Sequence, residues 1–279
     1  MNSLISIIIP CYNDADFIDQ AVNSALNQTY SNKEIIVVDD GSNQKTKAVL
    51  KSIEPKIDRL IVQNNQGQSS ARNKGIKASH GEFIIVLDSD DYFESTYTEQ
   101  ALEIISKRKE VKIATCWGRR ITENDILIDI FKPGGGGLNS FLLQNGSFGS
   151  CMFRKSDWGR VGGYDESMKQ GFEDWEFYIR LIELGGEAYV IPEVLFNYRS
   201  RKNSTTARAN KIKYDLRRYI LDKHQNLYQK HHLIHAQYLM KLLEREEFEK
   251  LKNLKRIEFR IGFIILKPLR RLKRIFFFD

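Results

Sequence analysis

Three acidic side chains stand within four residues at Asp88-Ser89-Asp90-Asp91. Neighbouring carboxylates repel one another, so such a group is costly unless a positive charge compensates it. Carboxylates combined with water and phosphate oxygens are ligands that suit Mg²⁺ or Mn²⁺. The segment therefore predicts a divalent-metal site with Asp88 and Asp90 as ligands. An acidic cap on a following helix is the alternative interpretation.

Residues that could hold a nucleotide precede this segment. Tyr12 could stack on a planar base, and Asp39 could accept a hydrogen bond from a ring N–H of that base. Partial burial would equally explain Tyr12, and an Asp before Gly-Ser is often simple turn chemistry. The sequence contains neither GxxxxGK[ST] nor GxGxxG, so P-loop and dinucleotide-binding sites are not supported. The charge of a bound diphosphate would have to be balanced by a metal and by Arg72.

Four apolar runs must position these residues, and each run ends just before a polar group. They are rich in isoleucine and valine, as strands buried on both faces are, and they lie at 4–10, 34–38, 60–63 and 83–87. Their ends lie 28, 25 and 24 residues apart, about the length of a repeating strand–helix unit. This spacing predicts parallel strands in an α/β layer, where ligands bind at the carboxyl ends of the strands.

Helical patterns fill the gaps between these runs. An apolar face over 17–26 predicts a first helix, with Asn13 and Asp14 as capping candidates. A later helix is expected over 173–184, where two glycines would end it. From about residue 210 onward the pattern is helical and highly charged, so a helical C-terminal region is expected.

Charge is distributed unevenly along the 279 residues. Residues 201–279 carry 21 Lys and Arg against 8 Asp and Glu, whereas residues 1–200 carry 22 against 28. An acidic body argues against nucleic acid as a partner and places any anionic partner at the C-terminal region. The three cysteines form no CxxC pair, and no stretch reaches the ~20 apolar residues of a membrane span. We therefore expect a cytoplasmic protein.

Five segments carry a wider resemblance, and in chain order they are SIIIPCYNDADFIDQAVNSALNQTY, EIIVVDDGS, NNQGQSSARNKGI, GEFIIVLDSDD and GFEDWEFYIRL. Together they resemble family 2 glycosyltransferases of the GT-A fold, over roughly residues 3–200. The resemblance implies a Rossmann-like, mostly parallel sheet flanked by helices. It also implies an inverting, non-processive transfer from a nucleotide-diphosphate sugar, with a UDP-sugar as the first expectation. Mn²⁺ or Mg²⁺ would be the cofactor, and the acceptor would be a glycan or lipid-linked sugar in cell-surface polysaccharide biosynthesis.

The resemblance also assigns site residues by position. The residues that would bind the nucleotide sugar are Pro10, Tyr12, Asp39, Arg72, Asp88, Ser89 and Asp90, the first three at the base. Asp88 and Asp90 would form the DxD motif, with Asp90 the more direct metal ligand, and Asp174 would be the catalytic base. Inversion in one displacement needs a base for the acceptor hydroxyl and charge stabilisation on the leaving diphosphate. Without the resemblance, Asp174 is equally explained as an acid at a helix N-terminus.

Three other functions fit part of the pattern. A processive polysaccharide synthase would share the catalytic domain, but its QxxRW motif and membrane helices are absent from this sequence. A phosphoacceptor signalling domain also holds acids at strand ends, yet its acidic pair would follow the first strand, where Cys11-Tyr12-Asn13 stands. A sugar-nucleotide-binding protein without transfer activity stays open, although each expected carboxylate is present.

The sequence predicts two domains. The catalytic domain is expected at 1–208, with a nucleotide-binding half at 1–117 and an acceptor-binding half at 118–208. A basic helical region is expected at 209–279.

The end of this basic region has a distinct pattern. Ile257, Ile261, Ile264 and Ile265 fall on one helical face, an apolar face continues beyond Pro268, and Lys and Arg surround it. An apolar stripe beside basic residues suits an anionic bilayer surface. Residues 255–279 therefore predict peripheral attachment to the inner face of the cell membrane. Packing on the catalytic domain, or on a second chain to form an oligomer, is the alternative.

Overall fold

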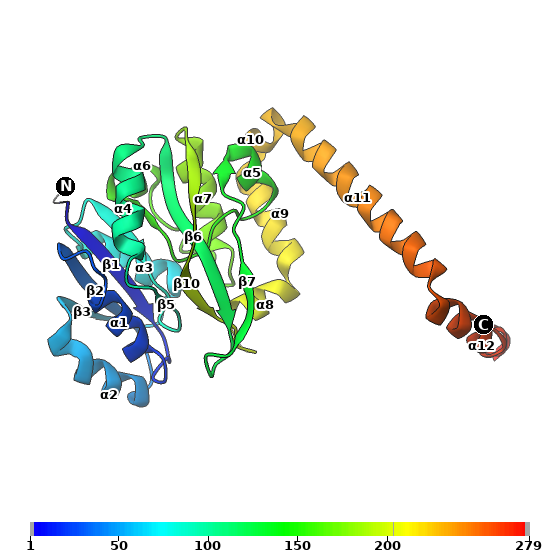
Figure 1. Cartoon of the computed structure of the whole chain (residues 1–279), viewed down its shortest axis with the longest axis horizontal. Coiled ribbons are helices and arrows are strands. Elements are labelled where there is room, and N and C mark those ends of the chain that lie inside the picture. The colour runs from blue at the N-terminus through cyan, green and yellow to red at the C-terminus, as the bar shows by residue number, and fades with distance from the viewer. Residues whose placement is uncertain (1–2, 203, 277–279) are drawn as a thin grey trace. The chain divides into compact units, whose positions relative to one another are not determined.

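Two compact units make up the chain. The computed structural model describes residues 3–202 and 204–276, with the backbone alone for 267–276. The first unit is Met1–Gln225 and the second is Asn226–Asp279, and Figure 1 shows the path of the chain through both. The first unit continues beyond residue 208. The predicted end of the catalytic domain at 208, and its two predicted halves, stay predictions.

The first half of the sheet is parallel. Its strands are β1 (Ile5–Cys11), β2 (Lys33–Asp40), β3 (Arg59–Gln63) and β4 (Phe83–Val86), in the spatial order β3-β2-β1-β4. All seven residues of β1 and all four of β4 are buried, as their continuous apolar runs predict. Cys11 of β1 is level with Asp39 of β2, so the polar residues that follow these strands meet at one edge. The predicted parallel α/β arrangement is confirmed.

The second half of the sheet mixes both directions. Its strands are β5 (Tyr92–Phe93), β6 (Val111–Ile121), β7 (Leu127–Phe131), β8 (Gly136–Gly137), β9 (Met152–Arg154) and β10 (Glu187–Arg199). The short β9 joins the halves, because it pairs antiparallel with β4 on one side and with β6 on the other. Beyond it, β6 pairs parallel with β10, and β10 pairs antiparallel with β5. The antiparallel joint brings elements from the two halves of the sequence to the same edge of the sheet.

Helices cover both faces of this sheet, as Figure 1 shows for the first unit. They are α1 (Ile18–Leu26), α2 (Gln44–Ile53), the short 3₁₀ helix η1 (Glu54–Lys56), α3 (Gln68–Ala78), α4 (Tyr97–Lys107), α5 (Leu138–Leu143), α6 (Lys155–Val161), α7 (Glu173–Glu183), α8 (Thr205–Lys211) and α9 (Lys213–Lys223). Alternate residues of β1, such as Ile7 and Ile9, share one core with α1, α2 and α4. Ile8 faces α3, where a Cβ on Gly75 would lie 2.5 Å from its Cγ2, so the close approach of helix and strand requires that glycine.

The loops at the polar edge of the sheet differ from the predicted helix caps. The helix α1 begins after Phe17 and has no side-chain cap, so Asn13 and Asp14 do not cap it through their side chains. Asn13 adopts a left-handed conformation with φ of 59°, and its Oδ1 accepts a hydrogen bond from the backbone N–H of Asn43. The Asp14 carboxylate accepts hydrogen bonds from Ser89 and Arg201 instead. The side chains of this loop therefore hold neighbouring loops in place around the pocket described below.

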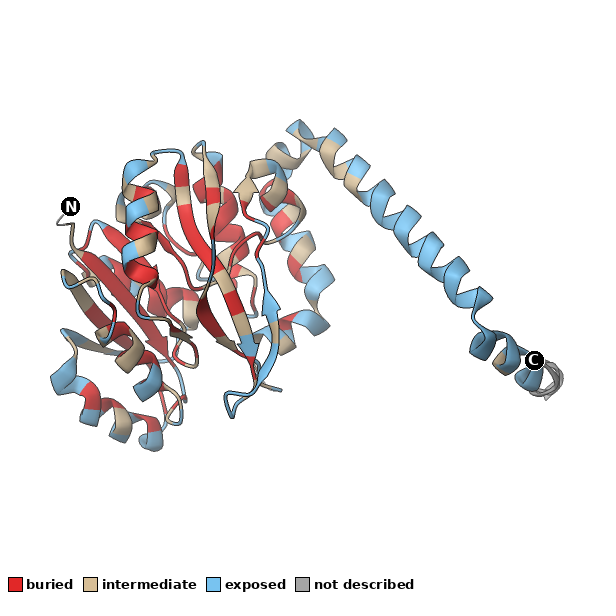
Figure 2. Cartoon of the chain, viewed as in Figure 1, coloured by how far each residue is buried: buried red, intermediate tan, exposed pale blue. Residues whose placement is uncertain are grey.

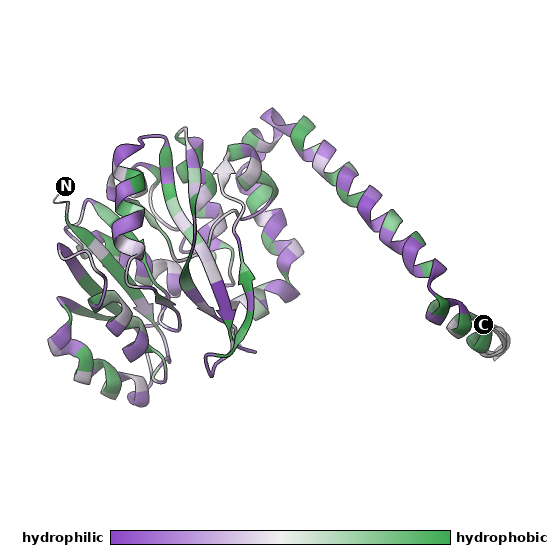
Figure 3. Cartoon of the chain, in the orientation of Figure 1, coloured by the Kyte–Doolittle hydropathy of each residue, from purple (hydrophilic) through white to green (hydrophobic). Residues whose placement is uncertain are grey.

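The second unit consists of helices. Most of α10 (Gln225–Lys230) lies in it, followed by α11 (His232–Lys255) and α12 (Ile257–Phe276). None of the 24 residues of α11 is buried, and Figure 2 shows the helix as almost entirely exposed. Figure 3 shows apolar and polar residues mixed along it. Within the described part of the chain, no helix is both long enough and apolar enough to cross a membrane. The apolar side chains predicted beyond Pro268 lie outside the described side chains.

Candidate active site

A pocket of about 900 Å³ opens at the carboxyl ends of the parallel strands in the first unit. Seven of the eight predicted site residues line it, namely Pro10, Tyr12, Arg72, Asp88, Ser89, Asp90 and Asp174. Asp39 is the exception, because it is buried and its Oδ1 accepts the backbone N–H of Ser42 at 2.9 Å. Its neighbour Asp40 lines the pocket and accepts the N–H groups of Gln66 and Gly67. The role of Asp39 in base binding stays a prediction.

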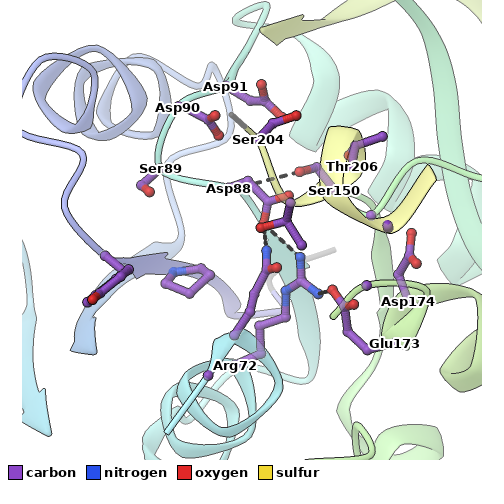
Figure 4. Close-up of a pocket in the computed structure, with 18 of the residues that line it drawn as sticks. Arg72, Asp88, Ser89, Asp90, Asp91, Ser150, Glu173, Asp174, Ser204 and Thr206 are labelled. Atoms are coloured by element: carbon purple, nitrogen blue, oxygen red, sulfur yellow. Dashed lines mark hydrogen bonds and ion pairs between the residues drawn. The ribbon is translucent and has the colours of Figure 1, made fainter. Parts of the chain in front are cut away.

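Asp88 lies just beyond β4, and only one of its two carboxylate oxygens accepts hydrogen bonds from described residues. Its Oδ1 accepts hydrogen bonds from Arg72 at 2.7 Å and from Gln68 at 2.9 Å. No hydrogen-bond partner lies on its Oδ2 within residues 3–202 and 204–276. Arg72 is buried, and its second terminal nitrogen donates to Glu173 Oε1 at 2.7 Å, as Figure 4 shows. The guanidinium therefore links the acidic segment to the start of α7.

Asp90 lies beside an arginine from the distant end of the unit. Arg201 Nη2 is 2.7 Å from Asp90 Oδ2, and its Nη1 is 2.7 Å from Asp14 Oδ1. Ser89 Oγ donates to the other oxygen of Asp14 at 2.5 Å. Burial raises the pKa of Asp90 well above its usual range, and the Arg201 charge partly offsets that rise. Arg201 thus balances the charge of two pocket carboxylates.

Asp91 also lines the pocket, and one of its oxygens is held by the backbone. It accepts the backbone N–H of Arg199 at 2.7 Å, at the end of β10. The Arg199 guanidinium is buried and donates to the backbone oxygen of Asp90 and to the Asp125 carboxylate. These contacts fix the loop that carries the acidic segment against β10.

Asp174 sits in the first turn of α7. Its Oδ2 accepts a hydrogen bond from Asn145 at 2.9 Å, and its Oδ1 accepts the backbone N–H of Trp175 at 2.7 Å. Burial raises the pKa of this carboxyl to about 7, the neighbouring Glu173 charge adds to the rise, and Arg72 opposes it. A carboxyl with such a pKa in a pocket can accept a proton near neutral pH.

Gly149 lies between the carboxylates of Asp174 and Asp88. A Cβ placed there would lie 3.4 Å from Asp174 Oδ2 and 3.8 Å from Asp88 Oδ2. The same point is 3.7 Å from Arg72 Nη2. The predicted base and a predicted metal ligand therefore face one common space, and a side chain at residue 149 would enter it.

Several functional positions are missing from the sequence-based prediction. Asn145 and Gly149 lie in a segment with no recognisable pattern, and their roles depend on contacts with α7. Asp14 and Arg201 are paired across 187 residues of sequence. Spacing could not reveal such pairs, because nothing in a single sequence marks two distant residues as neighbours.

The donor set suits a hard divalent cation that takes part of its ligands from a substrate. Within the described residues, no three His, Cys, Asp or Glu side chains cluster as a complete metal site. Asp88 and Asp90 offer two carboxylates at the pocket wall, with Asp88 Oδ2 open. Mg²⁺ and Mn²⁺ commonly bind through one or two carboxylates plus phosphate oxygens and water. The residues present fit that pattern.

Comparison with known proteins identifies the family. The sequence model described as "Glycosyl transferase family 2" matches residues 6–156, more than half of the chain. The chain belongs to glycosyltransferase family 2. The resemblance drawn from the sequence motifs is therefore confirmed.

Three relatives each match 65–73% of this chain. An uncharacterized glycosyltransferase of Rickettsia typhi is 33% identical over 218 residues, which are 73% of this chain and 66% of that protein. The putative teichuronic acid biosynthesis glycosyltransferase TuaG of Bacillus subtilis is 29% identical over 210 residues, 73% of this chain and 82% of TuaG. The chain spans only 27% of the chondroitin synthase of Escherichia coli, to which it is 31% identical over 192 residues.

Solved structures share the GT-A fold with this family 2 chain. TarS 1–349 of S. aureus, in complex with UDP-GlcNAc, superposes with a TM-score of 0.61 at 19% identity, covering 73% of this chain and 60% of TarS 1–349. The mannosyltransferase PcManGT of Pyrobaculum calidifontis, in complex with GDP-Man and Mn²⁺, has a TM-score of 0.59 at 18% identity, covering 78% and 61%. The predicted GT-A fold with a helical C-terminal extension is confirmed.

Proposed function

We propose that this chain is an inverting, metal-dependent glycosyltransferase. It would move a sugar from a nucleotide-diphosphate donor to a hydroxyl of a glycan or lipid-linked acceptor. The observation that carries the proposal is the approach of the Asp174 and Asp88 carboxylates to one point above Gly149. A base and a cation-binding acid that share a space are what a single in-line displacement requires.

In the proposed reaction, the acceptor oxygen forms a bond to the anomeric carbon while the bond from that carbon to the diphosphate breaks. The hydroxyl proton passes to Asp174, and the electron pair of the broken bond leaves with the diphosphate. The pKa of Asp174, about 7, suits proton acceptance near neutral pH. Hydrogen bonds from Asn145 and from the Trp175 N–H hold both carboxylate oxygens in place.

The leaving diphosphate needs its own charge stabilisation. Mn²⁺ or Mg²⁺ held by Asp88 and Asp90 would supply it as a Lewis acid. Arg72 holds Asp88 at 2.7 Å and Glu173 at 2.7 Å, so it keeps the acidic segment and the base-bearing helix in register.

We propose a UDP-sugar as the donor and a role in cell-surface polysaccharide biosynthesis. The UDP-GlcNAc in the TarS complex supports the first choice, and the teichuronic acid role named for TuaG supports the second. Tyr12 is 50% exposed in the pocket, which leaves its ring free to stack on a base. Pro10 and Ser89 line the same pocket.

The test separates binding from chemistry. Nucleotide sugars are screened with Mn²⁺ or Mg²⁺ for nucleotide release, and donor affinity is measured by calorimetry for the parent chain and for Asp174→Asn. We expect Asp174→Asn to abolish transfer while donor affinity stays within a few-fold, because the amide cannot accept the proton. Near-normal turnover of Asp174→Asn would refute the assignment of Asp174 as the base. A loss of donor affinity as large as the loss of turnover would refute it as well. Donor binding without release in the parent chain would indicate a sugar-nucleotide-binding protein.

We further propose peripheral attachment of residues 255–279 to the inner face of the cell membrane. Ile257, Ile261, Ile264 and Ile265 are exposed on α12, with one acidic residue, Glu258, in its first turn. The apolar stripe with surrounding Lys and Arg suits anionic lipid, where each cation near the surface contributes ~1 kcal/mol.

Liposome co-sedimentation of the full chain and of a chain ending at Asn253 tests this attachment. We expect the full chain alone to sediment with phosphatidylglycerol vesicles, less so at high salt, and not with neutral phosphatidylcholine. If both chains stay in the supernatant with anionic lipid at low salt, the attachment is refuted. A mass that exceeds the monomer in solution for the full chain, but not for the shorter one, would show that these helices form an oligomer instead.

A further inference from the structure

The pocket has cations that the proposed chemistry does not use. Arg72 and Arg201 are paired with acidic residues. Four further cations line the pocket without an ion pair anywhere in the described part of the chain, and they are Lys169, Lys202, Arg208 and Arg217. Unpaired cations that gather in one pocket of a unit with acidic segments require an explanation.

Two of the four lie toward the donor side. Lys202 directly follows Arg201, the partner of Asp90. The Lys169 side chain passes beside Gly67, where a Cβ would be 3.6 Å from its Cγ. Either cation can serve the donor phosphates, so neither bears on the acceptor. Arg208 and Arg217 remain.

Arg217, on α9, lies beside the catalytic helix. Its guanidinium carbon is 5.5 Å from the ring centre of Trp175, the residue that follows Asp174. The Nε of Arg217 is buried and has no hydrogen-bond partner. Because this Nε is enclosed by protein, an anionic ligand beside Trp175 would instead meet the terminal guanidinium nitrogens, which have no hydrogen bond or ion pair within the described residues.

Arg208, on α8, lines the same pocket as Arg217. Ala209 Cβ would be 2.6 Å from a Cβ on Gly171, so α8 packs directly onto the residue that precedes Phe172. Arg208 donates to Thr205 Oγ1 at 3.1 Å within α8, and its remaining donors are available to a ligand. The two arginines therefore line one pocket together with the segment that leads into α7.

That segment carries an aromatic pair. Phe172 adopts a left-handed conformation with φ of 63°, which is unfavourable for a bulky residue and is retained where the surrounding structure demands it. Its ring is 5.5 Å from the Trp175 ring. Both residues line the pocket together with Asp174, and a sugar ring can pack on aromatic faces.

We propose that the acceptor is an anionic saccharide, with a phosphate or carboxylate that Arg217 and Arg208 bind beside the Phe172–Trp175 pair. The inference rests on the proposed transferase function, since it takes Asp174 as the point that the acceptor hydroxyl reaches. The proposed donor diphosphate would lie with the metal at Asp88 and Asp90, so the two anions would not need the same cations.

The experiment compares three acceptor probes with the donor that the release screen identifies. They are a glucuronate-bearing oligosaccharide (chondroitin hexasaccharide), a glycerol-phosphate oligomer and the neutral maltohexaose. We expect at least one anionic probe to be used with a KM at least ten-fold lower than the neutral one. The anion that gives the lower KM identifies carboxylate or phosphate as the preferred group. Equal use of all three, or preference for maltohexaose, overturns the proposal.

Variants assign the effect to the arginines. Arg217→Ala is expected to raise the KM for the anionic probe at least ten-fold and to leave the Kd for UDP within two-fold, with partial recovery in Arg217→Lys. Arg218→Ala is the matched control, because Arg218 is the next residue on α9, is exposed and pairs with Asp215. A KM for Arg217→Ala equal to that of Arg218→Ala, or a loss of UDP affinity in Arg217→Ala alone, would refute the assignment.

A binding measurement keeps this inference separate from the transferase proposal. Calorimetric titration of the full chain with each oligosaccharide needs no turnover. If no donor is cleaved but an anionic oligosaccharide binds and Arg217→Ala abolishes that binding, the transferase proposal fails and the anion site stands. If nucleotide is released but no anionic oligosaccharide binds, the transferase proposal stands and the anion site fails.

Discussion

Replacing Glu176 by Gln should destabilise the first unit by about 3 kcal/mol. Glu176 lies on α7 with its side chain fully buried, and it contacts two cations, Arg180 and Lys223, and the ring of His224. Arg180 donates to both of its oxygens at 2.8 and 2.6 Å, and His224 and Lys223 each lie 3.0 Å from Oε1. Gln keeps the size of the side chain but removes the charge that balances this group.

The size of this destabilisation follows from the pKa shift of the Glu176 carboxyl. Burial alone would raise its pKa, yet hydrogen bonds from His224, Arg180 and Lys223 and the charge of Arg180 lower the pKa from 4.5 to about 2. At 1.36 kcal/mol per pKa unit, this shift corresponds to about 3 kcal/mol of folding free energy. Removal of one member of a buried ion cluster costs roughly 3–5 kcal/mol in general, which agrees.

Urea unfolding of the parent chain, Glu176→Gln and the control Glu183→Gln tests the estimate. Glu183 is the exposed last residue of α7, so its change should cost little. Because the folded pKa is lowered, the Glu176 contribution is complete above about pH 4.5 and declines as the pH falls toward 2, to less than about half near pH 3. A deficit below about 1 kcal/mol at pH 7, or one that does not change between pH 7 and pH 3, would refute the reasoning.

Three further outcomes are expected. The rate of transfer should rise as the pH increases through about 7, because the Asp174 base must be deprotonated, and a flat profile from pH 5.5 to 8.5 would contradict this. Gly149→Ala should lower turnover at least ten-fold at unchanged urea stability, since its Cβ would lie 3.4 Å from Asp174 Oδ2. Calorimetry with Mn²⁺ alone should show opposite changes, weaker binding in Asp90→Ala and tighter binding in Arg201→Ala, because Arg201 competes for Asp90 at 2.7 Å. Equal changes in both variants would refute that competition.

The sequence predicts the strands of the first half of the sheet well, because each contains a run rich in isoleucine, valine or leucine. The predicted burial on both faces is wrong for β3, which lies at the end of the strand order and has Val62 59% exposed. Asp88, Ser89, Asp90 and Tyr12 then meet at the pocket because parallel strands end at one edge. The strand β10 was not predicted, although it is the longest in the described sheet. Pro192 and Glu193 interrupt its pattern, and its register shifts at that point, so the alternation that marks a strand is lost.

The contacts that complete the site could not be predicted for a different reason. Arg72 bonds to Glu173 across 101 residues, and a single sequence does not reveal that such residues meet. Asp14 was interpreted as a helix cap because Asp before an apolar helix usually is one, but its carboxylate is paired with Arg201. In both cases a contact with a residue distant in sequence, rather than local preference, determines where the side chain lies.

The division of the chain at Gln225 affects how its unfolding should be measured. All three tryptophans, Trp117, Trp158 and Trp175, belong to the first unit, so their fluorescence reports that unit alone. Far-ultraviolet ellipticity also counts α11, a 24-residue helix without a buried residue, which can unravel at little cost in packing. The two signals should therefore follow different curves in the same titration. Such a mismatch is normally taken as the sign of a folding intermediate, but here we expect it from the loss of α11 before the first unit unfolds.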